Sequence, residues 1–305
     1  REPLREELGF EEIVKLSEEL GSMEALQLGG DDPLRRELLP EIVHQFARHN
    51  GVAKIQLATD GRDPERSAHA CRRILEARTI EQLSIDFTLD PIALKEGELE
   101  TAIASYDAIA ELQQRDPRLH LALHSTVGAD NIEQIEQLSN YLYARCPQLE
   151  RHNLTMPRGA ASVERRAPDL GRYLALDRDV KNRWADRERG RLRRIVRPAL
   201  AWTSAQTASR RVQIVPCKAG VLSAVVYANG DVSVCETVLS HPILGNLRER
   251  SFRELWHSPQ AQKARTMIRT RQCACTNEVF LSPSVTFQPA HLVRALVRSK
   301  VRPQP

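Results

Sequence analysis

Two periodicities of apolar residues alternate along the first half of the chain. Repeats every three or four positions predict amphipathic helices, and the short apolar runs between them are typical of buried strands. The predicted helices are Phe10–Leu20, Leu39–Arg48, Asp63–Glu76, Leu99–Arg115 and Asn131–Ala144, and the predicted strands are Ala25–Leu28, Ala53–Ala58, Gln82–Phe87, Leu119–Leu123 and His152–Met156. Strand and helix alternating in this way predict parallel strands joined by right-handed crossovers.

About five such strands predict an α/β fold, with an open or partial barrel in place of a closed eight-stranded one. Ligands of parallel α/β proteins bind at the carboxyl ends of the strands. Polar residues and glycines lie at or near these ends: Gly29, Gly30, Asp31 and Asp32 after the first strand, Thr59 and Asp60 after the second, and Ser84 and Asp86 in the third. Each alone is typical of an ordinary turn, but together they indicate a binding pocket.

The last third of the chain contains a hairpin bracketed by cysteines. Leu222–Tyr227 is an apolar run rich in β-branched residues, Asn229-Gly230 is a tight-turn signal, and Asp231–Val234 alternates polar residues with valine. This pattern predicts a β-hairpin. Its formation would bring Cys217 and Cys235 towards the same end.

Two more cysteines, Cys273 and Cys275, follow a pair of predicted helices. Ser251 with Glu254 three residues later is a capping-box pattern, and Pro259–Arg269 forms the second helical stretch. Four thiolates complete either a zinc site or an iron–sulfur cluster. The alternatives are buried, inert thiols or disulfides, but a close cysteine pair at the far end of this unit favours ligation.

Composition limits the protein class. The chain has 305 residues, of which 41% are hydrophobic, so it is long enough for one large core and a smaller unit. No apolar run approaches the roughly 18 to 20 residues that span a bilayer, and we expect no secretory signal. Six cysteines, four of them clustered, indicate a reducing cytoplasm. A net charge of +4 gives no reason to expect nucleic-acid binding.

The cysteine hairpin resembles the SPASM or twitch extension of radical S-adenosylmethionine enzymes. The shared signature is a cysteine, twelve residues, a glycine, four residues and a cysteine, which this chain has as Cys217, Gly230 and Cys235. The segments NGDVSVCE, LGNLRERSFRELWHS and CACTNE also resemble those of this family. Cysteines of such extensions hold an auxiliary 4Fe–4S cluster, so the resemblance implies iron–sulfur in preference to zinc.

The same resemblance implies a ligand set, which comprises Cys217, Cys235, Cys273 and Cys275. Two positions depart from relatives that read Cys-x-Cys-Thr-His-Glu-Cys. Asn277 stands in place of the histidine, and Val279 stands in place of the last cysteine. If that cysteine is a ligand in the relatives, the cluster here is three-coordinated, labile or absent.

The strand ends also resemble the radical S-adenosylmethionine core. The family's Gly-Gly-Glu-Pro, which holds the methionyl amino group, appears here as GGDDP, with Asp31 or Asp32 replacing the glutamate. Its Thr-Asn-Gly appears as Thr59-Asp60-Gly61. Ser84 and Asp86 occupy strand positions that face the cofactor's ribose in such enzymes. The resemblance therefore implies an S-adenosylmethionine site along this rim.

One family motif does not occur in the 305 residues. Such enzymes carry Cys-x-x-x-Cys-x-x-Cys after the first strand, where it holds the cluster that cleaves S-adenosylmethionine. Arg1–Leu8 resembles the segment just downstream of it, so we expect a truncation that removed the first strand; a degenerate relative is the alternative. We expect residues 1–305 alone not to cleave S-adenosylmethionine. Cys71 and Cys146, which lie far apart, are expected to be core or surface thiols.

Four segments are expected. They are a partial radical S-adenosylmethionine core (1–165), a basic helical linker (166–212), the SPASM/twitch domain (213–285) and an amphipathic basic tail (286–305), which we expect to pack on the core rather than lie on a membrane surface.

The resemblance implies an enzyme that forms a 5′-deoxyadenosyl radical and abstracts hydrogen from a substrate. The cofactors implied are S-adenosylmethionine, the auxiliary 4Fe–4S cluster and a second 4Fe–4S cluster in the intact enzyme. The partners implied are an electron donor and a peptide, protein or small-metabolite substrate. The sequence assigns no catalytic residue. The alternative is a non-catalytic iron–sulfur or zinc module that binds a partner.

Overall fold

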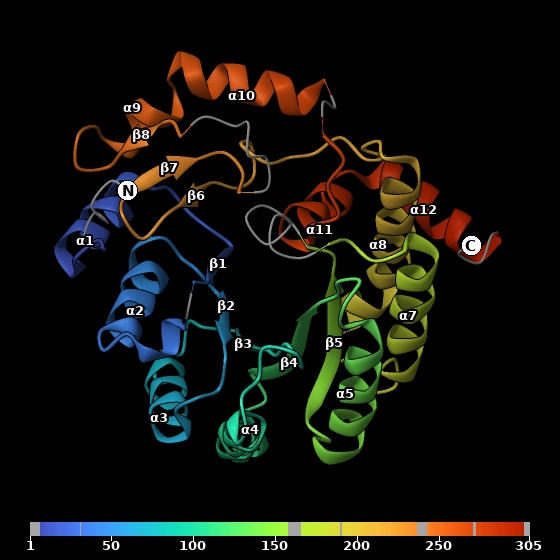
Figure 1. Ribbon diagram of the computed structural model, residues 1–305. Coiled ribbons are helices and arrows are strands. Elements are labelled where there is room, and N and C mark those ends of the chain that lie inside the picture. The colour runs from blue at the N-terminus through green and yellow to red at the C-terminus, as the bar shows by residue number, and fades with distance from the viewer. Residues whose placement is uncertain are drawn as a thin grey trace. The chain divides into compact units, whose positions relative to one another are not determined.

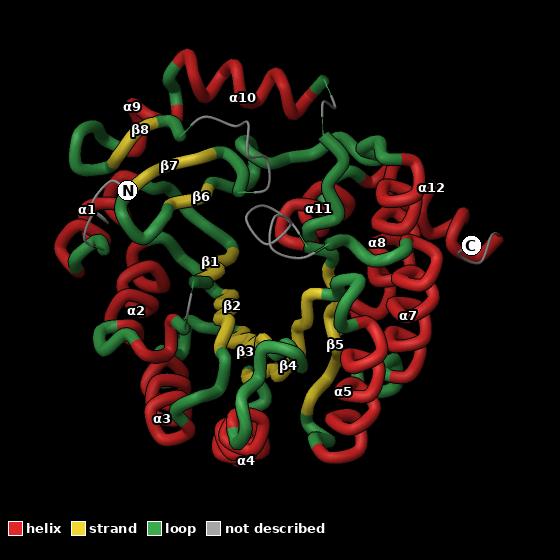
Figure 2. Tube along the Cα trace, in the orientation of Figure 1, coloured by secondary structure: helices red, strands yellow, loops and turns green. Residues whose placement is uncertain are grey.

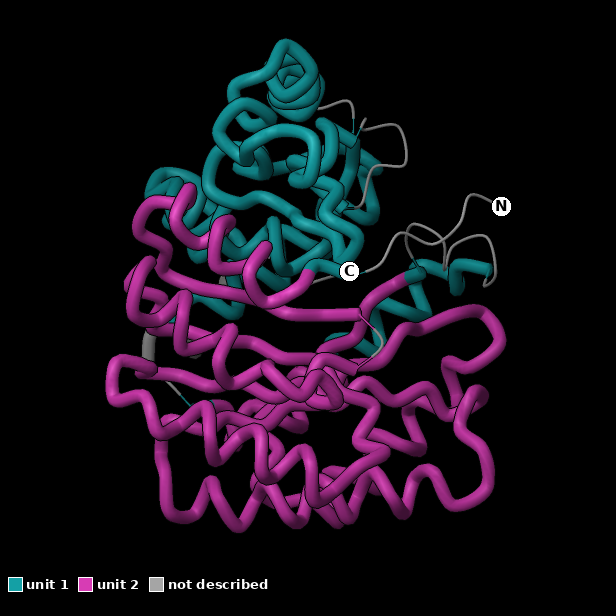
Figure 3. Tube along the Cα trace, turned by 90° about the vertical axis from the view of Figure 1, so that its left-hand side faces the viewer, with its two compact units in different colours: residues 1–8, 157–178, 189–305 teal, residues 9–156, 179–188 magenta. Residues whose placement is uncertain are grey.

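The computed structural model describes residues 7–30, 32–157, 166–189, 191–236, 243–270 and 273–301. The chain divides into two compact units (Figure 3). The sheet unit comprises Gly9–Met156 and Asp179–Glu188, and the cysteine unit comprises Arg1–Leu8, Pro157–Arg178 and Arg189–Pro305. No helix in the described ranges is long and apolar enough to cross a membrane.

The sheet unit is built on five parallel strands in the order β1-β2-β3-β4-β5, with α2 to α5 along one face (Figures 1 and 2). The strands are β1 (Ala25–Leu28), β2 (Lys54–Thr59), β3 (Gln82–Thr88), β4 (Leu119–Thr126) and β5 (Leu149–Thr155). The helices are α1 (Phe10–Glu19), the 3₁₀ turn η1 (Pro33–Arg35), α2 (Leu39–His49), α3 (Pro64–Leu75), α4 (Glu98–Arg115) and α5 (Ile132–Arg145). This confirms the predicted α/β partial barrel.

Strands β4 and β5 are longer than predicted. β4 continues to Thr126 because His124 to Thr126 pair with the end of β5. β5 begins at Leu149, which pairs with Leu121, and the register shifts before the next pair. The first residues of β5 include the charged residues Glu150 and Arg151, so the start of this strand is not an apolar run.

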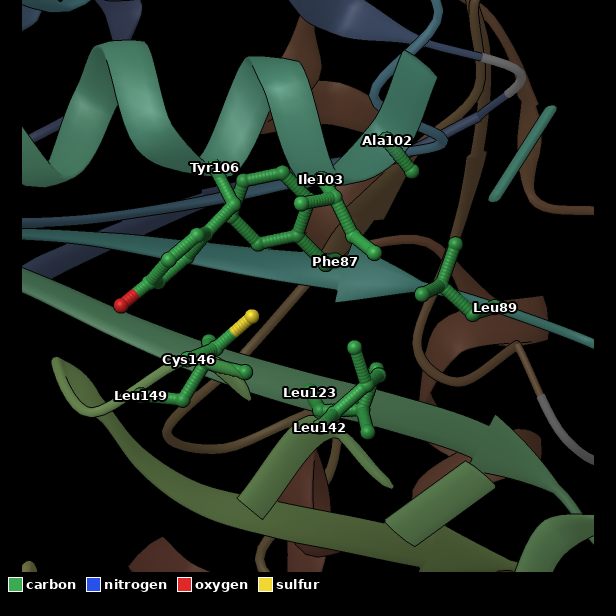
Figure 4. A pocket seen from close by; sticks show the side chains of 9 residues that line it. All are labelled: Phe87, Leu89, Ala102, Ile103, Tyr106, Leu123, Leu142, Cys146 and Leu149. Carbon is green, nitrogen blue, oxygen red and sulfur yellow. The ribbon is translucent and has the colours of Figure 1, made fainter. Parts of the chain in front are cut away.

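Side chains on the two faces of β3 have different surroundings. Ile85 and Phe87 are buried, and the ring of Phe87 packs edge-on against Tyr106 of α4, with ring centroids 6.3 Å apart. Beside this contact a small apolar pocket of about 10 Å³ is lined by nine side chains (Figure 4). One of them is Cys146, and burial raises the pKa of its thiol to about 12. Because strand residues alternate, Ser84 and Asp86 face away from α4.

Arg118, just before β4, ties the C-terminal end of α3 to the sheet. Its guanidinium is paired with Asp116 at 2.6 Å. It also donates hydrogen bonds to three backbone carbonyls, those of Leu75 at 2.6 Å, Ala77 at 3.0 Å and Ile80 at 3.0 Å. One side chain therefore fixes both the last residue of α3, at Leu75, and the turn that follows the helix, at Ala77 and Ile80.

We expect Arg118→Ala to lower the free energy of unfolding by about 2–3 kcal/mol, because several charge-assisted hydrogen bonds are lost together. Arg145→Ala is the matched control. Arg145 pairs with Asp107 at 2.7 Å on the exposed surface, and such pairs contribute about 0–1 kcal/mol. Urea denaturation of both variants measures the difference, and equal losses would contradict the role given to Arg118.

The cysteine unit contains a small antiparallel sheet and several helices. The strands are β6 (Val225–Val226), β7 (Asp231–Ser233) and β8 (Gly245–Asn246). The helices are α8 (Arg191–Arg210), α9 (Phe252–Trp256), α10 (Pro259–Arg269), α11 (Glu278–Thr286) and α12 (Pro289–Val301), and α7 (Leu170–Arg183) contributes residues to both units.

The predicted hairpin forms about Asn229-Gly230, where Gly230 has a φ of +88°. Such a backbone angle favours glycine. β6 is shorter than the predicted strand because the backbone N–H groups of Val221 and Leu222 both turn back to the carbonyl of Lys218. Val221 and Leu222 are consequently exposed.

Helices α8, α11 and α12 share an apolar core within the cysteine unit. Its buried members are Ala199, Val215, Leu281, Val285 and Ala295. Leu292 and Leu296 of α12 pack against it. The amphipathic C-terminal segment thus forms a helix that packs one side on its neighbours, whereas Val293 and Val297 remain exposed.

Candidate metal centre and strand-end site

Cys217 and Cys235 flank the β6–β7 hairpin, and α11 anchors the approach to Cys217. The backbone N–H of Lys218 donates to Ser284 Oγ at 2.9 Å, and Gln288 Nε2 donates to the carbonyl of Pro216 at 2.7 Å. Cys235 is buried two residues after the end of β7. The hairpin thus delivers one thiol before its first strand and one after its second.

Cys273 and Cys275 lie on the segment that leads into α11. A buried side chain holds this segment, since the backbone N–H of Cys275 donates to Gln213 Oε1 at 2.9 Å. The sulfur of Cys275 accepts a hydrogen bond from the N–H of Asn277 at 3.3 Å, and that of Cys217 accepts one from Ala219 at 3.5 Å. Hydrogen bonds of this kind support thiolate ligands in iron–sulfur proteins.

None of the four cysteines forms a disulfide in the described part of the chain, and their side chains interact electrostatically. Burial raises the pKa of Cys273 to about 11, and the thiolates of Cys217, Cys275 and Cys235 add to the rise. Burial also raises the pKa of Cys217, and Cys275 and Cys235 act in the same direction. Four soft donors that repel one another as thiolates are suited to a cation or cluster that neutralises them.

The geometry is nevertheless not that of a closed metal site. Among the described residues, no three His, Cys, Asp or Glu side chains are arranged to hold a metal ion. The donor chemistry, four soft thiols that interact with one another, fits an iron–sulfur cluster.

Asn277, which stands where the relatives have histidine, bridges two of the cysteine segments. Its Oδ1 accepts from the N–H of Val279 and caps α11, while its Nδ2 donates to Glu236 Oε1 at 2.6 Å. Glu236 directly follows Cys235, and Asn277 is two residues after Cys275. This contact therefore fastens the Cys235 segment to the Cys275 segment.

Asn277→Ala is expected to lower the free energy of unfolding of the cysteine unit by about 2 kcal/mol, because it removes both the helix cap and the bond to Glu236. Asn277→Ser is the matched control, since its hydroxyl still caps α11 but does not donate an amide N–H to Glu236. Limited proteolysis should rank the serine variant between the alanine variant and the wild type. If the serine and alanine variants were equally susceptible to proteolysis, the cap on α11 would not contribute to the stability of the cysteine unit.

At the ends of β1 and β2, Asp32 and Thr59 form a buried hydrogen-bonded pair. Thr59 Oγ1 donates to Asp32 Oδ2 at 3.0 Å and accepts from the N–H of Gly61, also at 3.0 Å. The N–H of Leu34 donates to Asp32 Oδ1 at 3.0 Å. Burial raises the pKa of Asp32 to about 6, hydrogen bonds from Thr59 and Leu34 lower it, and neighbouring Asp60 raises it.

The adjoining loop positions have distinct roles. Asp60 lies in the turn after β2, where it accepts the N–H of Arg62 at 3.0 Å. Gly61 has a φ of +73°, and a Cβ there would lie 3.0 Å from the Cα of Ala102, so a larger residue would be strained. Gly29 and Gly30 follow β1, and Asp31 lies outside the described residues. Asp32, Thr59 and Asp60 thus lie close together at the ends of β1 and β2.

Ser84 and Asp86 lie within β3, apart from that loop cluster. Gln82 Nε2 donates to Ser84 Oγ at 2.7 Å. Asp86 accepts from Gln56 Nε2 of β2 at 2.5 Å and faces Arg151 Nη2 of β5 at 3.5 Å. Sequence reasoning missed Gln56 and Arg151, although Gln56 is a polar residue between the two apolar residues Ile55 and Leu57 of its strand.

Residues 217–277 match the sequence model of the SPASM family, described as an iron–sulfur cluster-binding domain. This range contains all four cysteines of the candidate centre. No curated protein matches the sequence.

The fold is similar to solved structures of two radical S-adenosylmethionine enzymes. One is Streptococcus suis SuiB bound to S-adenosylmethionine, with a TM-score of 0.53 and 11% identity over 80% of this chain and 57% of SuiB. The other is anSMEcpe with bound S-adenosylmethionine, with a TM-score of 0.54 and 13% identity over 84% of this chain and 70% of anSMEcpe. The predicted resemblance is therefore confirmed for the SPASM domain and for the fold.

Proposed function

We propose that this chain, which combines a SPASM iron–sulfur cluster-binding domain with the fold of radical S-adenosylmethionine enzymes, takes part in the chemistry of such an enzyme, with residues 1–305 alone expected not to cleave S-adenosylmethionine. The observation that carries the proposal is the SPASM match, because all four candidate thiols lie inside it. In the proposal, Cys217, Cys235, Cys273 and Cys275 hold an auxiliary 4Fe–4S cluster.

The second part of the proposal concerns S-adenosylmethionine, which carries an ammonium, a carboxylate and a sulfonium. Its ammonium would be held by the acidic group at the ends of β1 and β2, and its ribose by residues of β3. The proposed binding residues are Gly29, Gly30, Asp31, Asp32, Thr59, Asp60, Ser84 and Asp86. Asp32 is the best placed for the ammonium, since its carboxylate is fixed by two hydrogen bonds and retains free lone pairs.

When bound, these cofactors supply the chemistry of the family, in which one electron cleaves S-adenosylmethionine and the resulting 5′-deoxyadenosyl radical abstracts a substrate hydrogen. The protein's own part is to bind, orient and exclude water. The substrate would be a peptide, a protein or a small metabolite, and an external donor would supply the electron.

Equilibrium dialysis of anaerobically reconstituted residues 1–305 with radiolabelled S-adenosylmethionine tests this proposal. We expect saturable binding, and weaker binding of S-adenosylhomocysteine, which lacks the sulfonium charge that an acidic site attracts. Absence of saturable binding would contradict the proposed cofactor site.

A further inference from the structure

The face of the sheet that carries Asp86 also holds a cation with an unmet hydrogen-bonding requirement. Arg151 projects from β5, and its side chain is only 13% exposed. Its one anionic contact given by the structure is to Asp86, at 3.5 Å, the long limit of a hydrogen bond. Its other terminal nitrogen, Nη1, is buried and has no hydrogen-bond partner among the described residues.

Strand alternation places this nitrogen on the face opposite to helix α4. Phe87 of β3 packs on Tyr106 of α4, so the adjacent Asp86 faces the other way, and Arg151 reaches Asp86 from that same side. Between them lies β4, whose residue paired with Asp86 is Ala122. A methyl group there allows the long side chain of Arg151 to pass over β4 towards β3.

Burying the Arg151 guanidinium with its Nη1 unsatisfied is energetically unfavourable. A guanidinium stays protonated at any physiological pH, so burial cannot neutralise it. Each buried donor without a partner costs about 1–3 kcal/mol. Asp86 does not satisfy the donors of Arg151. One of its carboxylate oxygens already accepts a hydrogen bond from Gln56, and the other lies 3.5 Å from Arg151 Nη2. An acceptor supplied by a ligand or by an ordered water satisfies a buried donor of this kind.

We propose that Arg151 binds a carboxylate of the substrate, an inference that rests on the proposed function of this sheet face. The planar guanidinium matches a carboxylate, which accepts two N–H bonds in one plane. A phosphate dianion fits less well, because Asp86 lies beside the guanidinium and would repel a doubly charged group. The position thus selects a singly charged, planar anion. Asp86 is also a proposed cofactor residue, so this carboxylate would be bound beside S-adenosylmethionine.

Propionate and its uncharged isostere propionamide are suitable probes for the full chain, residues 1–305. At constant ionic strength, saturating propionate is expected to raise the Tm of the wild type by about 2 °C, as expected for a ligand that binds only the folded state. Propionamide should leave the Tm unchanged. Arg151→Gln should abolish the propionate response, while Arg145→Gln, which removes the same charge from an exposed pair on α5, should retain it.

Measuring the affinity for S-adenosylmethionine distinguishes a carboxylate of the substrate from the carboxylate of S-adenosylmethionine itself. If Arg151 serves the substrate, Arg151→Gln should change the affinity for S-adenosylmethionine by less than twofold. A loss of tenfold or more would overturn the proposal by assigning Arg151 to the cofactor's own carboxylate. An equal response to propionate in both glutamine variants, or an equal response to propionamide, would overturn it as well. Failure of the wild type to bind S-adenosylmethionine would contradict the proposed function alone, since the propionate response is read independently.

Discussion

Cys235→Ala is expected to reduce the iron and sulfide retained after anaerobic reconstitution to less than about a quarter of the wild-type content. A cluster held by thiolates loses both affinity and the folding free energy that ligation supplies when one thiolate is removed. The cysteine unit should therefore also become susceptible to limited proteolysis. Iron and sulfide assays on gel-filtered protein measure the first effect.

Cys71→Ala is the matched control for this experiment. Cys71 is a fully buried thiol in α3 of the sheet unit, and burial raises its pKa to about 12, so it remains a packing group. Its replacement should cost about 1 kcal/mol of stability and no iron. Equal iron contents in the two variants would show that Cys235 is not a ligand.

The affinity for S-adenosylmethionine is expected to rise about tenfold between pH 5 and pH 7, if Asp32 binds the methionyl ammonium. With a pKa raised to about 6, Asp32 is mostly protonated at the lower pH and mostly ionised at the higher one. Only the ionised form attracts the ammonium. Equilibrium dialysis across this range, with Asp107→Asn as an exposed-carboxylate control, measures the profile. An affinity that is independent of pH would remove Asp32 from the site.

The same pKa has the opposite effect on stability. Because the folded pKa lies above the usual 3.8, this group contributes stability below that value and loses the contribution as the pH rises through about 6. Asp32→Asn should therefore flatten the fall in the free energy of unfolding over this range while weakening S-adenosylmethionine binding. Thr59→Val should shift the binding profile to higher pH, because the hydrogen bond from Thr59 lowers the pKa of Asp32.

The apolar pattern predicted most of the sheet because its inner strands are buried on the helix side. It missed the start of β5, where Leu149 is followed by two charged residues that meet partners on neighbouring elements. It also gave no helix at Glu278–Thr286, since Pro283 and the β-branched residues lower helix propensity there. Tertiary packing of Leu281 and Val285 against α8 and α12 overrides that preference.

The sequence likewise predicted one part of the candidate site and missed another. Cysteine spacing and the glycine-containing turns are local signals, so the sequence predicted the segments that carry them. The supporting contacts join residues far apart in the chain: Gln213 lies 62 residues from Cys275, and Glu236 lies 41 residues from Asn277. Arg151 is 65 residues from Asp86. No local pattern encodes such pairs, and only the folded arrangement of strands and loops brings them together.

Elemental analysis of anaerobically purified and reconstituted protein, combined with Mössbauer spectroscopy after ⁵⁷Fe loading, tests whether the four cysteines hold a 4Fe–4S cluster. We expect iron and acid-labile sulfide in equal amounts, about four of each per chain, with the spectrum of a 4Fe–4S cluster that is mostly lost in Cys235→Ala and persists in Cys71→Ala. Stoichiometric zinc without sulfide would contradict it.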